Sequence, residues 1–113
     1  MNYLCLVYYQ ESEINKMSAS EWAALNQECM AYGQSIDASG HRLGGEALEP
    51  VHTATTVRVR NGKTTTTDGP FAETKEQLAG FYFIDAKDLN EAIQVASKIP
   101  PARLGSIEIR PVR

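Results

Sequence analysis

The chain has 113 residues, a length that predicts one domain over residues 1–113 with a modest hydrophobic core. Its hydrophobic fraction of 42% and charged fraction of 22% are typical of a soluble globular protein. The formal charge of −3, with basic residues spread along the chain, argues against direct binding to nucleic acid or to an anionic membrane. No window reaches the roughly 18 apolar residues of a membrane span, and the first residues do not resemble a signal peptide, so we expect a cytoplasmic protein.

The first third of the chain predicts a buried strand followed by a long helix. Residues 3–9 (YLCLVYY) form a continuous apolar run that is rich in strand-forming residues. Ser18 or Ser20 is the predicted N-cap of the helix, and Gly40 is the predicted end. The apolar residues between them recur every three or four positions, as on one face of a helix: Trp22, Leu25, Cys29, Tyr32 and Ile36.

The middle of the chain predicts a short strand and a β-hairpin. Residues 43–48 form the strand, in which the pair Gly44-Gly45 indicates a bulge or a close backbone approach. Residues 54–60 end in strict alternation, and Asn61-Gly62 is a strong signal for a hairpin turn because both turn positions need a positive φ. Residues 63–67 are therefore the returning strand.

The last third predicts a strand, a helix and a final strand. Residues 78–85 (LAGFYFID) form a largely apolar strand, and residues 106–110 (SIEIR) alternate as the last one. Asp88 or Asn90 caps the helix, and Pro100-Pro101 ends it. One stripe of this helix is apolar: Leu89, Ala92, Ile93, Ala96 and Ile99.

This order predicts an α+β fold, a ferredoxin-like sandwich in which an antiparallel sheet carries two helices on one face plus an extra β-hairpin. Residues 3–9 and 81–84 are apolar at every position, so both faces of these strands require burial. Leaving a Tyr, Phe or Ile exposed would forgo about 1.5–3 kcal/mol per side chain. Because two helices cover only one face, we expect a homodimer packed sheet against sheet, a dimeric α/β-barrel-like assembly.

The chain contains no sequence motif for a nucleophile, a nucleotide or a metal. His41 and His52 lack partners at metal-ligand or triad spacing, so we expect no metal and no cofactor. Cys5 and Cys29 lie in apolar patterns and are expected to be reduced core residues. His41 is a candidate ligand-binding residue because it stands beside the glycine-containing strand, and the alternative is a solvent-exposed loop histidine.

Residues 68–76 (DGPFAETKE) allow a structural and a functional interpretation. In the structural one they form a corner between strands, with Phe71 anchored at the edge of the core. In the functional one, Asp68 and Glu73 are the catalytic acid and base, provided that partial burial raises the pKa of one of them. Three further residues would then bind the ligand: Phe71 as an apolar wall, Lys75 as the partner of an anionic group, and Arg58 as a charge partner.

The run TDGPFAETKEQLAGFYFIDAKDLNEAI (residues 67–93) closely resembles the DGPF-type members of the YCII-related family. GGEALEPVHTATTVRVRNGKT before it and GSIEIRPV after it extend the resemblance over essentially the whole chain. The resemblance implies a ferredoxin-like domain that dimerises. Many family members carry an aspartate at the end of the first strand and a histidine early in the first helix, as a candidate catalytic pair. In this chain Glu11 follows the first strand, and residues 18–26 contain no histidine.

The first functional hypothesis is a YCII-related protein with a small-molecule pocket between the sheet, a helix and the 68–76 loop. Any acid/base chemistry, of the lyase or isomerase kind, would then fall to Asp68 or Glu73. The alternative is a non-enzymatic sensing or interaction module, because DGPF-type relatives are fused to, or encoded near, sigma factors of the extracytoplasmic-function class. If the loop is purely structural, Phe71→Ala would cost about 3–5 kcal/mol of stability.

Overall fold

A computed structural model describes residues 1–113 and shows a mixed α+β fold. The strands β2, β5, β1 and β6 form an antiparallel sheet in that order, and β3 pairs with β4 in a separate two-stranded sheet. No helix is long and apolar enough to cross a membrane. In chain order the elements are β1 (Asn2–Tyr9), α1 (Glu11–Ile14), α2 (Ala19–Ala38), β2 (Arg42–Ala47), η1 (Val51–Thr53), β3 (Thr55–Arg60), β4 (Lys63–Asp68), β5 (Gln77–Asp85), α3 (Leu89–Ala96), η2 (Pro100–Arg103) and β6 (Ser106–Pro111).

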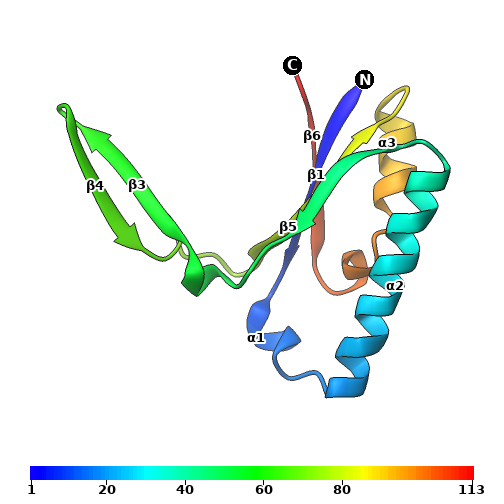
Figure 1. Ribbon diagram of the computed structural model, residues 1–113, viewed down its shortest axis with the longest axis horizontal. Helices are drawn as coiled ribbons and strands as arrows, with labels where there is room; N and C mark the ends of the chain where they lie inside the picture. Colours follow the sequence, from blue (N-terminus) through cyan, green and yellow to red (C-terminus); the bar gives the residue numbers. More distant parts are fainter.

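Helices α2 and α3 cover the same face of the four-stranded sheet (Figure 1). The core lies between this face and the two helices, and the side chain of Tyr32 crosses it to donate a hydrogen bond of 2.8 Å to the Val95 carbonyl oxygen. Its buried residues are Tyr3, Cys5, Val7, Tyr32, Ile36, Ile84, Ala86, Ala92, Val95, Ala96 and Ile99. The expectation that the sheet carries its helices on one face is therefore confirmed.

The local signals at the helix ends act as predicted. The Ser18 side chain accepts a hydrogen bond from the Glu21 N–H, and the Glu21 carboxylate accepts one from the Ser18 N–H, which together form a capping box. Asp88 caps α3 by accepting from the Glu91 N–H at 2.9 Å. The short helix α1 was not expected from the sequence, and α3 ends at Ala96, before the predicted Ile99.

The apolar stripe of α2 is only partly buried. Leu25, Tyr32 and Ile36 are buried, but Trp22 keeps 42% of its surface exposed. The same holds for the stripe of α3, where Leu89 and Ile93 are about half exposed. In Figure 1 the N-terminal part of α2 extends away from α3 toward α1, so this part of the helix has less of the fold to pack against.

Strands β3 and β4 form the predicted hairpin, with Asn61 at φ 52° and Gly62 at φ 75° in the turn. The hairpin projects from the side of the sheet that α2 and α3 do not cover (Figure 1). Its apolar side chains Val57 and Val59 are 59% and 56% exposed. An isolated two-stranded hairpin is marginally stable in water, so these exposed valines are a surface that lacks a partner within the chain.

The helix-free face of the sheet is apolar at its centre. Leu4 lies opposite Phe83, and Leu6 lies opposite Phe81, on the adjacent strands β1 and β5. All four side chains are half-buried in the single chain. The prediction that these strands are apolar on both faces is confirmed.

Candidate functional site

A cavity of about 1070 Å³ lies between α2 and the helix-covered face of the sheet. We call it the helix–sheet cavity. It is bounded by α2 on one side, by β1, β2 and β5 on the other, and by the segments that contain α1 and Glu49 at its ends. Its apolar walls include Val7, Trp22, Leu25, Met30 and Tyr82.

Small residues on the facing elements leave this space open. Gly33 of α2, Gly45 and Ala47 of β2, and Gly80 of β5 all line the cavity. A Cβ atom at Gly45 would lie 2.7 Å from the Phe81 carbonyl oxygen, and one at Gly80 would lie 2.8 Å from that of Glu46. Strands β2 and β5 therefore require glycine at both positions, and the bulge expected at Gly44-Gly45 is present as a register shift between Arg42 and Gly44.

Glu11 stands where the chain leaves β1 and enters α1, and it lines the cavity. One oxygen of its carboxylate, Oε2, accepts a hydrogen bond of 3.1 Å from the Val51 N–H. Its backbone N–H donates one of 2.9 Å to Oε1 of Gln77, the first residue of β5. These two bonds attach Glu11 to the segments on either side of the hairpin and hold its carboxylate in place.

Burial raises the pKa of three weakly acidic groups in the cavity lining. It raises the pKa of the Tyr9 hydroxyl, and the negative charge of Glu11 raises that pKa further. Burial likewise raises the pKa of the Cys29 thiol and of the Tyr82 hydroxyl. At neutral pH these side chains are therefore neutral hydrogen-bonding groups, and Cys29 is a thiol rather than a nucleophilic thiolate.

Both cysteines are free, as expected, but only Cys5 is a core residue. Cys29 is half-buried and lines the cavity. The assignment of Cys29 to the core was wrong because α2 stands off the sheet at this level.

The residues predicted in the 68–76 loop lie outside the cavity lining. Asp68 ends β4, and Asp68, Glu73 and Lys75 are all exposed. Phe71 is 80% exposed, so the interpretation of Phe71 as an anchor at the edge of the core is wrong for the single chain. The corner itself depends on the backbone, because the Gly69 N–H donates a hydrogen bond of 2.7 Å to the Ala54 carbonyl oxygen.

Arg58 lies against this loop. One nitrogen of its guanidinium group is 3.4 Å from Oγ1 of Thr67, and another is 3.5 Å from the carbonyl oxygen of Phe71. Arg58 forms no ion pair with Asp68 or Glu73 in the single chain.

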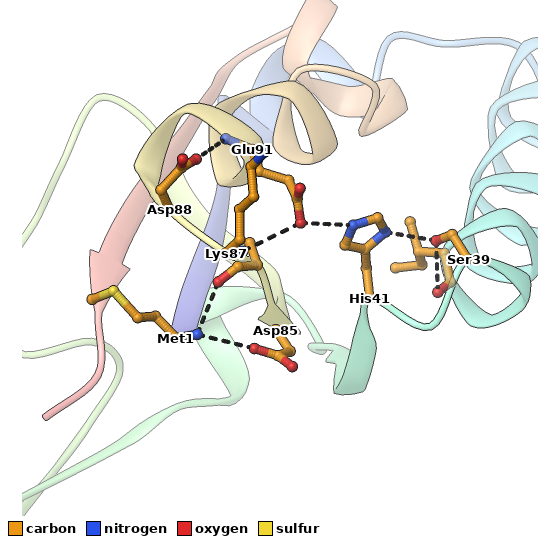
Figure 2. A network of polar contacts seen from close by, with 9 residues as sticks. Met1, Ser39, His41, Asp85, Lys87, Asp88 and Glu91 are labelled. Carbon is orange, nitrogen blue, oxygen red and sulfur yellow. Dashed lines mark hydrogen bonds and ion pairs between the residues drawn. The ribbon is translucent and has the colours of Figure 1, made fainter.

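His41 belongs to a different part of the molecule, a polar network shown in Figure 2. Its Nδ1 atom is 2.7 Å from the Ser39 hydroxyl, and its Nε2 atom is 3.1 Å from the Glu91 carboxylate. Glu91 also accepts a hydrogen bond from the Lys87 N–H. A second, smaller cavity of about 410 Å³ adjoins His41 and Glu91. His41 is therefore half-buried and paired, which contradicts the alternative of a solvent-exposed loop histidine.

No group of three His, Cys, Asp or Glu side chains is arranged to hold a metal ion. The sequence interpretation missed the residues that line the helix–sheet cavity, because they come from segments that are far apart in the chain and share no motif. The one sequence signal for a cavity residue was Glu11. It follows the first strand, near the position where the family resemblance places an aspartate.

Comparison with known proteins agrees with the architecture. The family model for the YCII-related domain matches residues 1–113. An uncharacterized protein of Rhizobium meliloti (strain 1021) is 40% identical over 115 aligned residues, which cover 99% of this chain and 92% of that relative. This chain belongs to the YCII-related family.

Proposed function

We propose that this YCII-related protein binds a small molecule in the helix–sheet cavity. The observation that carries the proposal is the cavity itself, whose volume of about 1070 Å³ is slightly above the usual range for ligand sites, about 300–1,000 Å³. Its lining also has the usual character of such sites, because apolar and aromatic walls surround a few polar groups, among them Glu11, Tyr9 and Arg42.

The 68–76 loop contributes to this site through its C-terminal end. Nε2 of Gln77 donates a hydrogen bond of 2.7 Å to the Thr74 carbonyl oxygen, while Oε1 of the same side chain accepts from the Glu11 N–H. The Gln77 side chain thereby connects the loop to Glu11 at the edge of the cavity. If the protein catalyses acid/base chemistry there, Glu11 is the carboxylate in position, and Asp68 and Glu73 would need a second copy of the chain to bring them near a ligand.

A thermal-shift screen with a metabolite library tests the binding site. A true ligand at about a hundred times its Kd should stabilise the wild type by about 2.7 kcal/mol. Cys29→Phe, which places a bulky ring in the cavity, should abolish this stabilisation. Gln27→Phe adds the same ring on an exposed position of α2 outside the cavity and should preserve it. Equal stabilisation of both variants would place the ligand elsewhere.

We also propose that the fold is ferredoxin-like and that the protein forms a homodimer. The strand order β2-β5-β1-β6, with one helix after β1 and another after β5, supports the ferredoxin-like assignment. The apolar centre of the helix-free face, with Leu6 opposite Phe81, supports a partner sheet packed against it. Such packing would form the dimeric α/β-barrel-like assembly.

A second candidate function is a non-enzymatic interaction module, and the exposure of the loop favours it. Phe71 is 80% exposed beside exposed Glu73 and Lys75, a combination of apolar and charged groups suited to protein contact. The partner suggested by the family resemblance is a sigma factor of the extracytoplasmic-function class. A titration with a purified factor of this class should show binding that Phe71→Ser weakens at least tenfold, and equal binding by the variant would exclude the loop as the contact surface.

A further inference from the structure

We infer that the helix–sheet cavity selects ligands that carry an ammonium group on an apolar or aromatic body, and that the Glu11 carboxylate receives the ammonium. This inference rests on the proposed binding function and adds the chemical class of the ligand.

The charges around the cavity are the first observation. Four acidic residues line it, namely Glu11, Asp37, Glu46 and Glu49, whereas Arg42 is its only basic residue. Glu46 contributes its backbone, because it pairs with Phe81 and its side chain therefore lies on the helix-free face. The Arg42 guanidinium lies 3.5 Å from the Asp37 carboxylate and 3.5 Å from the Gly45 carbonyl oxygen, so its charge is already compensated. The three remaining carboxylates form no ion pair within the chain. The field inside the cavity therefore favours a cation and opposes an anion.

Among these three acids, Glu11 has the position of a recognition group. Glu46 and Glu49 are exposed on β2 and the loop after it, where water screens their charge. Glu11 is half-buried, and its carboxylate is held by the Val51 N–H at 3.1 Å through one oxygen only. The other oxygen accepts no hydrogen bond from the protein, so it is available to an ammonium donor on a ligand.

The aromatic walls of the helix–sheet cavity indicate that the rest of the ligand is apolar. Tyr9, Trp22 and Tyr82 line the same cavity and offer aromatic surface to an apolar body. Burial raises the pKa of the Tyr9 and Tyr82 hydroxyls, so neither ring bears a charge near neutral pH. Aromatic faces beside a carboxylate stabilise an ammonium through cation–π attraction in addition to the ion pair.

The test uses three probes with the same ring and a similar chain length, namely phenethylamine, phenethyl alcohol and hydrocinnamate. Each is titrated into the isotope-labelled full chain, and amide NMR shifts report both affinity and location. We expect shifts at cavity residues of α2 and β5. We expect phenethylamine to bind about tenfold more tightly than the alcohol, as for a hydrogen bond to a charged group, and hydrocinnamate to bind most weakly.

The matched variants are Glu11→Gln and Glu13→Gln. The amide oxygen of a glutamine at position 11 can still accept from the Val51 N–H, so the fold is retained while the charge is removed. Glu11→Gln should lose the about tenfold preference for the amine while binding the alcohol as before. Glu13→Gln changes an exposed residue of α1 that does not line the cavity, and should keep the preference.

The outcomes separate the two proposals. If phenethyl alcohol shifts the cavity residues but phenethylamine binds no better, or if Glu11→Gln keeps the preference, the ammonium inference is overturned and the binding function stands. If none of the three probes shifts the cavity residues at millimolar concentration, the ammonium inference is overturned, and the metabolite screen with Cys29→Phe decides the binding function separately.

Discussion

The Gln77 side chain connects the 68–76 loop to Glu11. Its Oε1 atom accepts the Glu11 N–H at 2.9 Å, and its Nε2 atom donates to the Thr74 carbonyl oxygen at 2.7 Å. A single amide thus joins the start of α1, the start of β5 and the loop between the hairpin and β5. Because Glu11 lines the helix–sheet cavity, the Gln77 side chain is a physical link between the 68–76 loop and the candidate site.

Gln77→Ala should loosen this link. The variant leaves the half-buried Glu11 N–H without its acceptor, and we expect a loss of about 1–2 kcal/mol in the free energy of unfolding. Urea denaturation measures the loss, and limited proteolysis should show faster cleavage within residues 71–76. Gln27→Ala, at an exposed helix position, is the control; an equally small effect of both variants would contradict the link.

Leu6→Lys should dissociate the proposed homodimer. The substitution places a charge at the centre of the helix-free face, opposite Phe81, where a partner sheet would bury it. In sedimentation at micromolar concentration, the wild type should be a dimer and the variant a monomer. Leu89→Lys alters an exposed residue of α3 on the other side of the sheet and should stay dimeric. A wild type that sediments as a stable monomer would refute the dimer.

Phe71→Ala should barely change the stability of the monomer. Because the ring is 80% exposed, we expect a change within about 0.5 kcal/mol when the variant is made in the monomeric Leu6→Lys background. Ile84→Ala removes a fully buried core side chain and should cost about 2–5 kcal/mol in the same background. Chemical denaturation measures both, and a loss near 3 kcal/mol for Phe71→Ala would restore the purely structural interpretation of the loop.

Stability should fall at alkaline pH because of Cys5. Burial raises the pKa of the Cys5 thiol from 9.0 to about 11, so the unfolded chain ionises first as the pH rises. The contribution of this thiol is complete below pH 9 and is lost progressively as the pH rises toward 11, a change of about 3 kcal/mol from a shift of about two units. Denaturation curves across this range measure it. Cys5→Ala should be less stable at neutral pH yet show a shallower alkaline decline, whereas an unchanged slope would assign the effect to other groups.

Ser18→Ala should weaken the start of α2. The substitution removes the side-chain oxygen that accepts the Glu21 N–H, and N-cap losses of this kind cost about 1 kcal/mol. Thermal unfolding followed by circular dichroism provides the measurement. Ser20→Ala, within the first turn of the same helix, keeps the cap bond and should have a smaller effect.

The sequence by itself determined the six strands, the helices α2 and α3, and their order along the chain, but not the short helix α1. Ser18, Asp88 and Asn61-Gly62 act through neighbours within four residues, so their capping and turn geometry is local and can be inferred without a tertiary structure. The continuous apolar runs of β1 and β5 likewise predicted strands that are apolar on both faces, because side-chain direction in a strand alternates regardless of the fold. The signature segment also indicated the family.

Only the tertiary structure decided where a ligand could bind. The cavity exists because α2 stands off the sheet above Gly45 and Gly80, and residues far apart in sequence line it together. The 68–76 loop, in which the predicted acid and base lie, is exposed. Glu11 instead lies at the cavity, where Val51 and Gln77 from distant segments bind it. Such long-range contacts depend on how helices and strands pack, and local sequence patterns carry no record of that packing.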